Sequence, residues 1–335
     1  MQSEPSVLAR RDGRVGRLLL NRPKALNALD LEMIRAIRAA LEAWRDEPEV
    51  HAIVVEGAGD RAFCAGGDIR ALRSLAMAAE RDAVETFFAE EYALNFAIAE
   101  YPKPYVALID GICMGGGIGV SVHGDIRVAS ERAVLAMPET AIGFFPDIGA
   151  SYFLPRLPGA LGMFLALTGE RMQGADAVHS GLATHYAPRA AFPALSAALA
   201  ADGVAAVAEH AAPLPAFSLA AHRPAIDRCF GANSVDELIA RLEAEGSDWA
   251  RRTLATLRTM APAAVLWSFE LIRRGAHRTL RQCLDAELAL TRHITRHPDY
   301  FEGVRAMVVD KDRQPRWSAS RIEDVDRAAI AAMFA

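Results

Sequence analysis

The sequence is poor in cysteine, has no excess of basic residues and contains no long uninterrupted apolar run. Only 4 of the 335 residues are cysteine and none forms a Cys-x-x-Cys pair, which predicts neither a redox dithiol nor a zinc cluster. We expect these cysteines to be small buried side chains in a reducing compartment. The net charge of -5 argues against a general nucleic-acid binder, because such binding needs a concentrated basic surface.

Membrane segments are also not indicated. The longest apolar stretches are interrupted by Gly, Arg or Asp before they reach the length of a bilayer span. The first residues lack the basic-then-apolar profile of a secretory signal, so we expect a cytoplasmic protein with no membrane partner. With 52% hydrophobic and 24% charged residues, the chain has the balance of a globular protein.

The N-terminal half alternates between strand-like and helix-like segments. Asp30 is a plausible N-cap for an amphipathic helix that runs to Trp44. Short apolar runs predict strands at residues 18–20, 52–55, 105–109 and 126–129. Strands that alternate with helices predict an α/β layered core with some parallel pairing.

The character of the chain changes after about residue 186. Residues 190–225 are rich in Ala and Pro, and helical patterns follow at residues 235–245, 249–260, 263–274 and 280–297. We therefore predict an α/β core that carries the active site over residues 1–190 and a mainly helical region over residues 191–335.

Two glycine-rich turns follow predicted strands. The first contains Gly66 and Gly67, and the second has three consecutive glycines from Gly115 to Gly117. Such turns let the backbone approach a ligand and direct N–H groups toward an anion or an oxyanion. A dinucleotide-binding turn is the rival interpretation, but Val120 stands where a Gly-x-Gly-x-x-Gly pattern would place its last glycine.

Two carboxylates, Glu139 and Asp147, lie in an otherwise apolar segment from Met137 to Gly149. Burial raises the pKa of a carboxyl group, so a pair in different surroundings can supply a general base and an orienting group. The alternative is that both side chains only cap local helices or turns.

These three segments, together with residues 21–29, resemble the crotonase (enoyl-CoA hydratase/isomerase) superfamily in order and spacing. The resemblance implies an α/β fold: a crotonase-like spiral core of ββα units with a helical C-terminal part that often mediates trimer contacts. It implies an acyl-CoA substrate, with coenzyme A as part of the substrate and no separate cofactor.

The resemblance also implies roles for individual residues. The N–H groups of Gly67 and Gly116 would form the oxyanion hole for the thioester carbonyl. The coenzyme A channel would be lined by Lys24, Ala25, Asp68, Ile69 and Arg70. Arg22 and Arg70 are candidate phosphate partners, although a solvated surface explains both equally well.

One departure from the hydratase pattern indicates a subgroup. Hydratases of this superfamily generally use two glutamates, and the first of these positions is Gly119 here, which leaves Glu139 with Asp147. Residues 137–157, 164–169, 297–306 and 310–317 resemble the 3-hydroxyisobutyryl-CoA hydrolase subgroup. Glu91 matches a glutamate that this subgroup places at the substrate, although an ordinary acidic residue on a helix surface is the alternative.

The expected activity is hydrolysis of the thioester of 3-hydroxyisobutyryl-CoA, or of a similar short-chain 3-hydroxyacyl-CoA, in valine catabolism. An enoyl-CoA hydratase or isomerase and a non-catalytic acyl-CoA binder remain alternatives. His293 and His297 are four residues apart on a predicted helix but lack a third ligand, so no metal is predicted. Ser121 and Ser151 do not lie in a Gly-x-Ser-x-Gly elbow, which argues against a serine hydrolase.

Overall fold

The computed structural model describes residues 4–334, which form two compact units. The first unit comprises residues 4–68, 90–136 and 171–217, and the second comprises residues 69–89, 137–170 and 218–334. Each unit is therefore discontinuous in sequence and is described by itself. The division predicted at residue 190 stays a prediction.

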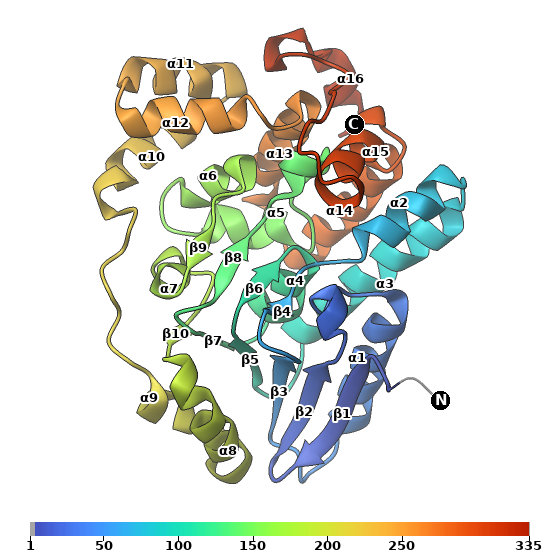
Figure 1. Cartoon of the computed structure of the whole chain (residues 1–335), viewed down its shortest axis with the longest axis vertical. Coiled ribbons are helices and arrows are strands. Elements are labelled where there is room, and N and C mark those ends of the chain that lie inside the picture. Colours follow the sequence, from blue (N-terminus) through green and yellow to red (C-terminus); the bar gives the residue numbers. More distant parts are fainter. Residues whose placement is uncertain (1–3, 335) are drawn as a thin grey trace. The chain divides into compact units, whose positions relative to one another are not determined.

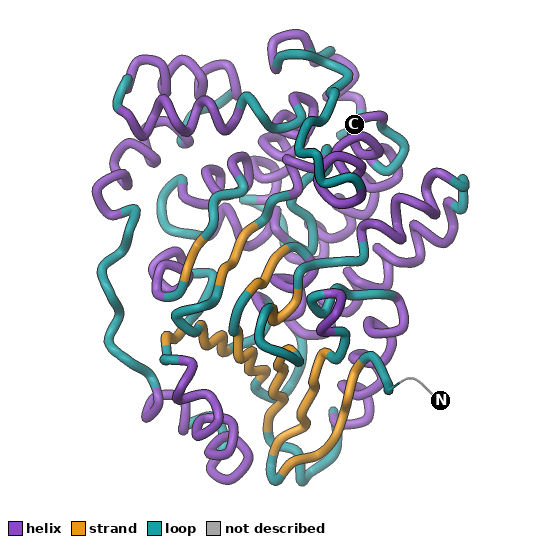
Figure 2. The backbone as a smooth tube through the Cα atoms, viewed as in Figure 1, coloured by secondary structure: helices purple, strands orange, loops and turns teal. Residues whose placement is uncertain are grey.

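Strands occur only up to residue 186 of the described chain, whereas helices occur throughout (Figures 1 and 2). The strands are β1 (Val7–Asp12), β2 (Val15–Leu20), β3 (Ala52–Gly57), β4 (Ala62–Cys64), β5 (Tyr105–Ile109), β6 (Ile112–Met114), β7 (Ile126–Ala129), β8 (Val134–Ala136), β9 (Met172–Gln173) and β10 (His185–Tyr186). The helices are α1 (Leu31–Trp44), α2 (Ile69–Met77), α3 (Arg81–Ala99), α4 (Gly116–Val122), α5 (Ala150–Phe153), α6 (Leu161–Thr168), α7 (Ala175–Ser180), α8 (Phe192–Asp202), α9 (Ala206–His210), α10 (Arg223–Phe230), α11 (Val235–Glu245), α12 (Asp248–Leu257), α13 (Pro262–Gly275), α14 (Leu280–Ile294), α15 (Pro298–Val304) and α16 (Arg327–Ala332).

The first unit contains two sheets. The six-stranded sheet has the order β1-β2-β3-β5-β7-β10, and all of its neighbours are parallel except the antiparallel pair β1 and β2. The four-stranded sheet has the order β4-β6-β8-β9. Three successive strand pairs, β3–β4, β5–β6 and β7–β8, each place one strand in each sheet and are followed by a helical segment. This repetition confirms the predicted ββα units.

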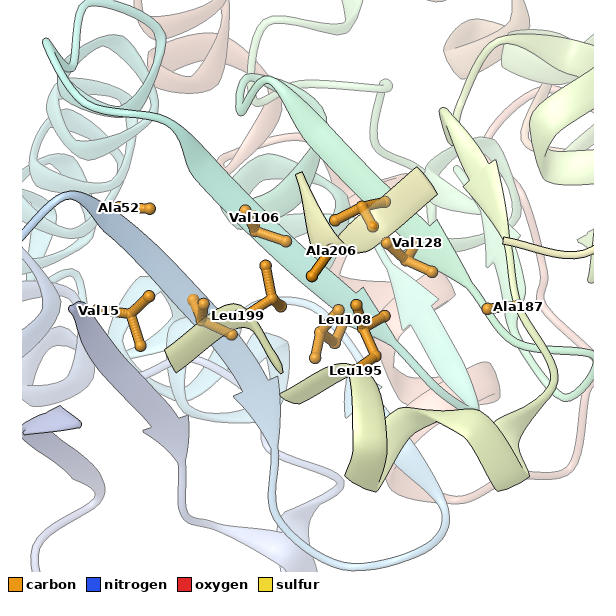
Figure 3. Close-up of a cluster of buried hydrophobic side chains, with 11 residues drawn as sticks. Val15, Ala52, Val106, Leu108, Val128, Ala187, Leu195, Leu199 and Ala206 are labelled. Atoms are coloured by element: carbon orange, nitrogen blue, oxygen red, sulfur yellow. The ribbon is translucent and has the colours of Figure 1, made fainter. Parts of the chain in front are cut away.

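A hydrophobic cluster covers one face of the six-stranded sheet. Val106 and Leu108 point from the strands toward Leu195 and Leu199 of α8 (Figure 3), and Val54 belongs to the same cluster. All five side chains are at most 2% exposed, so burial of apolar surface fixes α8 on the sheet. The cluster explains why the Ala-rich stretch after residue 190 is helical rather than a loose linker.

Most of the predicted helices and strands are confirmed. Asp30 caps α1 by accepting a hydrogen bond from the backbone nitrogen of Met33 at 2.8 Å. Helix α11 has the predicted bounds, and α12 and α13 differ from the prediction by at most three residues. The predicted strands at residues 105–109 and 126–129 also agree with β5 and β7.

The helix predicted over residues 280–297 is too long. Helix α14 ends at Ile294, and Pro298 is the first residue of α15. Because a residue before proline disfavours the helical conformation, His297 adopts extended backbone and becomes the N-cap of α15. His293 and His297 therefore do not share a helix, and the expectation that they lie on one helix face is wrong.

Candidate active site

The two glycine-rich turns lie next to each other in the first unit. The turn after β4 reaches Gly67, and the turn after β6 leads through Gly115 into α4. Gly66 has φ +105° and Gly115 has φ +47°, conformations that glycine adopts without steric cost. A Cβ atom at Gly116 would lie only 3.2 Å from the backbone nitrogen of Gly67. The structure therefore brings together the two backbone groups that the sequence predicts as an oxyanion hole.

The carboxylate of Glu91 on α3 lies at the same point. A Cβ atom at Gly116 would overlap Oε1 of Glu91, and it would lie 3.2 Å from Cδ1 of Leu29. Glu91 is 2% exposed, so it is not an ordinary acidic residue on a helix surface. The missing side chain of Gly116 thus lets Gly67, Glu91 and Leu29 pack closely against its backbone.

Cys64 lies near this space but is not a candidate nucleophile. Burial raises the pKa of the Cys64 thiol to about 12, and the negative charge of Glu91 adds to the rise. A thiol with this pKa stays protonated at neutral pH. All four cysteines are buried, as predicted, and none forms a disulfide within the described chain.

The N-terminal signature segment is fastened beside the first turn. The Asn27 side chain donates hydrogen bonds to the carbonyl oxygens of Ala58 (3.0 Å) and Ala62 (2.9 Å). The Arg22 guanidinium pairs with Asp30 at 3.1 Å and with Asp68 at 3.2 Å. Arg22 and Asp68 therefore form an internal ion pair, while Lys24 remains exposed to solvent.

Three further positions predicted for the coenzyme A channel lie in the N-terminal signature segment and at the start of α2. Ala25 is exposed in the first unit, and Ile69 and Arg70 begin α2 in the second unit. Arg70 donates a hydrogen bond to the carbonyl oxygen of Val308 at 2.8 Å. The channel roles of all three stay predictions.

Glu139 and Asp147 lie in the second unit and are each only 6% exposed. Glu139 follows Pro138 and begins a short 3-10 turn (Glu139–Ile142). Phe144 and Phe145 lie between the two acids in sequence. The Phe144 ring stacks on that of Phe145, with 4.5 Å between ring centroids, and on that of Phe88, with 5.6 Å. Both acids are therefore buried in a segment whose aromatic side chains are also packed in the interior.

Two groups that the sequence analysis did not assign to the site interact with Asp147. The Asp147 charge contributes to raising the pKa of Tyr300 and of Glu287, although burial is the main cause for both. The Tyr300 ring also packs at 5.8 Å from that of Phe144. Glu287 had one sequence signal: it is an acid on the apolar face of a helix, among Cys283, Leu284, Leu290 and Ile294.

The serines considered as nucleophiles have structural roles instead. The Ser121 hydroxyl donates to the carbonyl oxygens of Gly117 and Ile118, both at 3.0 Å. The Ser151 hydroxyl donates to the Glu287 carboxylate at 2.5 Å. Within residues 4–334, no group of three or more His, Cys, Asp or Glu side chains is arranged to hold a metal ion.

Comparison with known families identifies the class to which the chain belongs. A family model described as enoyl-CoA hydratase/isomerase matches residues 15–334. The chain therefore belongs to the enoyl-CoA hydratase/isomerase family, which confirms the crotonase resemblance seen in the sequence.

More specific relatives point to the predicted subgroup. A protein named "3-hydroxyisobutyryl-CoA hydrolase, mitochondrial" from Xenopus tropicalis is 46% identical over 334 residues, which cover 96% of this chain and 86% of that protein. The human protein of the same name is 44% identical over 331 residues, with coverage of 95% and 86%.

Solved structures share the whole fold. A protein titled carnitinyl-CoA dehydratase from Mycobacterium thermoresistibile has a TM-score of 0.94 and 40% identity, and it covers 99% of this chain and 97% of its own. An enoyl-CoA hydratase from Rhodobacter sphaeroides has a TM-score of 0.91 and 40% identity, with coverage of 98% and 97%.

The comparisons do not confirm the predicted location. The names of the hydrolase relatives refer to mitochondria, so the cytoplasmic location expected from the sequence is not supported. Over residues 4–334, none of the helices combines the length and the apolar character needed to span a membrane.

Proposed function

We propose that this chain hydrolyses the thioester of 3-hydroxyisobutyryl-CoA to the free acid and coenzyme A. The observation that carries the proposal is the near full-length identity of 44–46% to proteins named for this activity. The chemistry of the chain supports it, because Gly119 has no side chain to activate a water where family hydratases carry a glutamate. Glu139 and Asp147, by contrast, are both present and buried.

In the proposed mechanism, the N–H groups of Gly67 and Gly116 donate to the thioester oxygen. Negative charge develops on this oxygen when the carbonyl carbon is attacked, and a single such donor contributes about 3–4 kcal/mol in acyl-transfer sites. Glu139 removes a proton from the attacking water. The bond between carbon and sulfur then breaks, and the coenzyme A thiolate takes up a proton.

Asp147 orients the water or the substrate hydroxyl, and Glu91 binds the hydroxyl of the acyl group. A buried carboxylate is a strong acceptor for such a hydrogen bond. The lining of the coenzyme A channel by Lys24, Ala25, Asp68, Ile69 and Arg70 belongs to the same proposal.

Glu139 has a second version of its role, as a nucleophile that forms a transient mixed anhydride with the acyl group. A single turnover in ¹⁸O-labelled water separates the two versions. Label in the Glu139 carboxylate supports the anhydride, because water then attacks that intermediate. Label only in the released acid shows that water attacks an acyl carbonyl carbon, as general-base catalysis requires, and it excludes an anhydride that water attacks at the Glu139 carbon.

Hydration of an unsaturated acyl-CoA is the second candidate activity. It is favoured by the names of the two structural relatives, a dehydratase and an enoyl-CoA hydratase. This alternative requires Glu139 to act as the sole acid and base.

The deciding experiment measures thiol release from 3-hydroxyisobutyryl-CoA beside hydration of crotonyl-CoA, with the same purified protein. Thiol release that Glu139→Gln abolishes supports the hydrolase. Hydration without thiol release overturns it.

A cytoplasmic location and trimer-type contacts remain predictions, and light scattering of the purified protein tests the subunit number.

A further inference from the structure

Helix α14 places the carboxyl group of Glu287 on its buried face, where the side chain is 0% exposed. Burial of a carboxyl group is costly unless hydrogen bonds compensate for the lost water. Burial raises the pKa of Glu287 to about 8; hydrogen bonds from Ser151 and Gly149 oppose the rise, and the charge of Asp147 adds to it. An acid in this position therefore needs a reason beyond helix packing.

Glu287 binds the backbone directly after Asp147. Its Oε2 accepts from the backbone nitrogen of Gly149 at 2.7 Å, and its Oε1 accepts from the backbone nitrogen of Ser151 at 3.0 Å. The Ser151 hydroxyl adds a third hydrogen bond at 2.5 Å. One side chain thus satisfies three donors within three residues of the chain.

The segment that Glu287 holds is strained. Ile148 has φ +57°, which is a rare conformation for a β-branched residue, and Gly149 follows with φ +83°. A Cβ atom at Gly275 of α13 would overlap the carbonyl oxygen of Ser151, so α13 also packs closely on this segment. A strained backbone persists only where its surroundings fix it, and here α13 and the Glu287 carboxyl group do so.

We infer that Glu287 is a positioning residue, which fixes the Asp147 carboxylate by binding the backbone N–H groups of Gly149 and Ser151. The inference rests on the proposed role of Asp147 in thioester hydrolysis. Glu287 itself touches neither substrate nor water in this scheme. It acts by holding the left-handed turn at Ile148, which sets the direction in which the Asp147 side chain leaves the backbone.

The alternative is that Glu287 only caps the N-terminus of α5 and has no effect on catalysis. Two variants of Glu287 distinguish these two roles. Glu287→Met keeps the volume and removes every acceptor, while Glu287→Gln keeps one oxygen acceptor. The matched controls are Asp285→Met and Asp285→Asn, because Asp285 is an exposed acid on the same helix.

We expect Glu287→Met to lower kcat on the order of 10- to 100-fold with little change in KM, because misplacement of a reacting group by about 1 Å has this effect. Glu287→Gln should recover part of the loss, and both Asp285 controls should retain wild-type kcat. In an Asp147→Asn background, Glu287→Met should cause no further loss, since Glu287 acts through Asp147. Unchanged kcat in Glu287→Met, or losses that multiply in the double variant, would overturn the inference.

Amide hydrogen exchange distinguishes this result from a failure of the proposed function. The amides of Gly149 and Ser151 should lose protection in Glu287→Met and keep it in Asp285→Met. If the wild-type protein releases no thiol but this exchange pattern holds, the hydrolase assignment fails while Glu287 still fixes the segment. Unchanged exchange in Glu287→Met contradicts the positioning role whatever the substrate.

Discussion

The glycine turns of the first unit and the carboxylate segment of the second unit present polar groups in opposite ways. At Gly67 and Gly116 the proposed functional groups are backbone N–H groups, and the absence of a side chain at Gly116 lets the Glu91 carboxylate approach closely. At Glu139 and Asp147 the proposed functional groups are side-chain carboxylates, which are both buried, and Asp147 interacts electrostatically with the buried Glu287. The first arrangement is sensitive to any added atom, whereas the second is sensitive to loss of a charge or of a supporting hydrogen bond.

The largest effect is expected from Glu139→Gln, which keeps the shape of the side chain and removes its basicity. General-base catalysis accelerates a reaction about 10²- to 10⁴-fold. The rate of thiol release should therefore decrease by a factor in that range. Steady-state assays with 3-hydroxyisobutyryl-CoA measure it, and the melting temperature serves as the control for folding. Activity within a few-fold of wild type would show that the carboxylate is not the base.

The opposite type of change, one added methyl group, is tested by Gly116→Ala. The new Cβ would overlap Oε1 of Glu91 and crowd the backbone nitrogen of Gly67, so it would displace groups at the proposed oxyanion hole. Loss of a single oxyanion donor costs about 10²- to 10³-fold in kcat, and we expect a loss of this size.

Gly203→Ala is the matched control for Gly116→Ala. Gly203 has φ +80° but no atom within 4 Å of an added Cβ. Its substitution should lower the free energy of unfolding by about 1–3 kcal/mol through backbone strain and leave kcat unchanged. Equal kinetic effects of the two substitutions would mean that the loss at Gly116 reflects a general loss of stability rather than the oxyanion hole.

This contrast also explains what the sequence could predict. Each glycine turn and the Glu139–Asp147 segment is a short continuous stretch of the chain. Motif and spacing can therefore predict it from the sequence. Contacts between distant segments had no such signal: Glu287 is 138 positions from Gly149 in sequence, although their hydrogen bond is only 2.7 Å long. Helix periodicity predicts α14 but continues through Thr295 to His297, because periodicity does not contain the restriction that Pro298 places on the backbone of the preceding residue.

The hydrogen bonds of Glu287 to the carboxylate segment should affect how the free energy of unfolding depends on pH. The pKa of Glu287 is about 8 in the folded protein, against an ordinary value of 4.5. The folded state therefore binds more protons between these values, so the contribution of Glu287 to stability is complete below pH 4.5 and is lost as pH rises through about 8. The titratable groups that interact with it are Asp147 and Cys283.

Urea unfolding of the wild type and Glu287→Gln at about pH 5.5 and 8.5 measures this contribution. The free energy of unfolding of the wild type should decrease by on the order of 3 kcal/mol more than that of the variant between these two pH values. Parallel pH profiles would mean that Glu287 is ionised in the folded protein throughout.

The smallest expected effect belongs to Glu91. It is a buried carboxylate like Glu139 and Asp147, but it lies against the glycine turn at Gly116. If Glu91 binds the substrate hydroxyl, Glu91→Gln should lower kcat/KM for 3-hydroxyisobutyryl-CoA by about tenfold, since a charged acceptor binds a hydroxyl more strongly than an amide does. Isobutyryl-CoA lacks that hydroxyl and should be hydrolysed by the variant and by the wild type at similar rates. Equal losses for both thioesters would instead indicate that Glu91 shapes the oxyanion space, which would join it to the glycine turns rather than to the recognition of the acyl group.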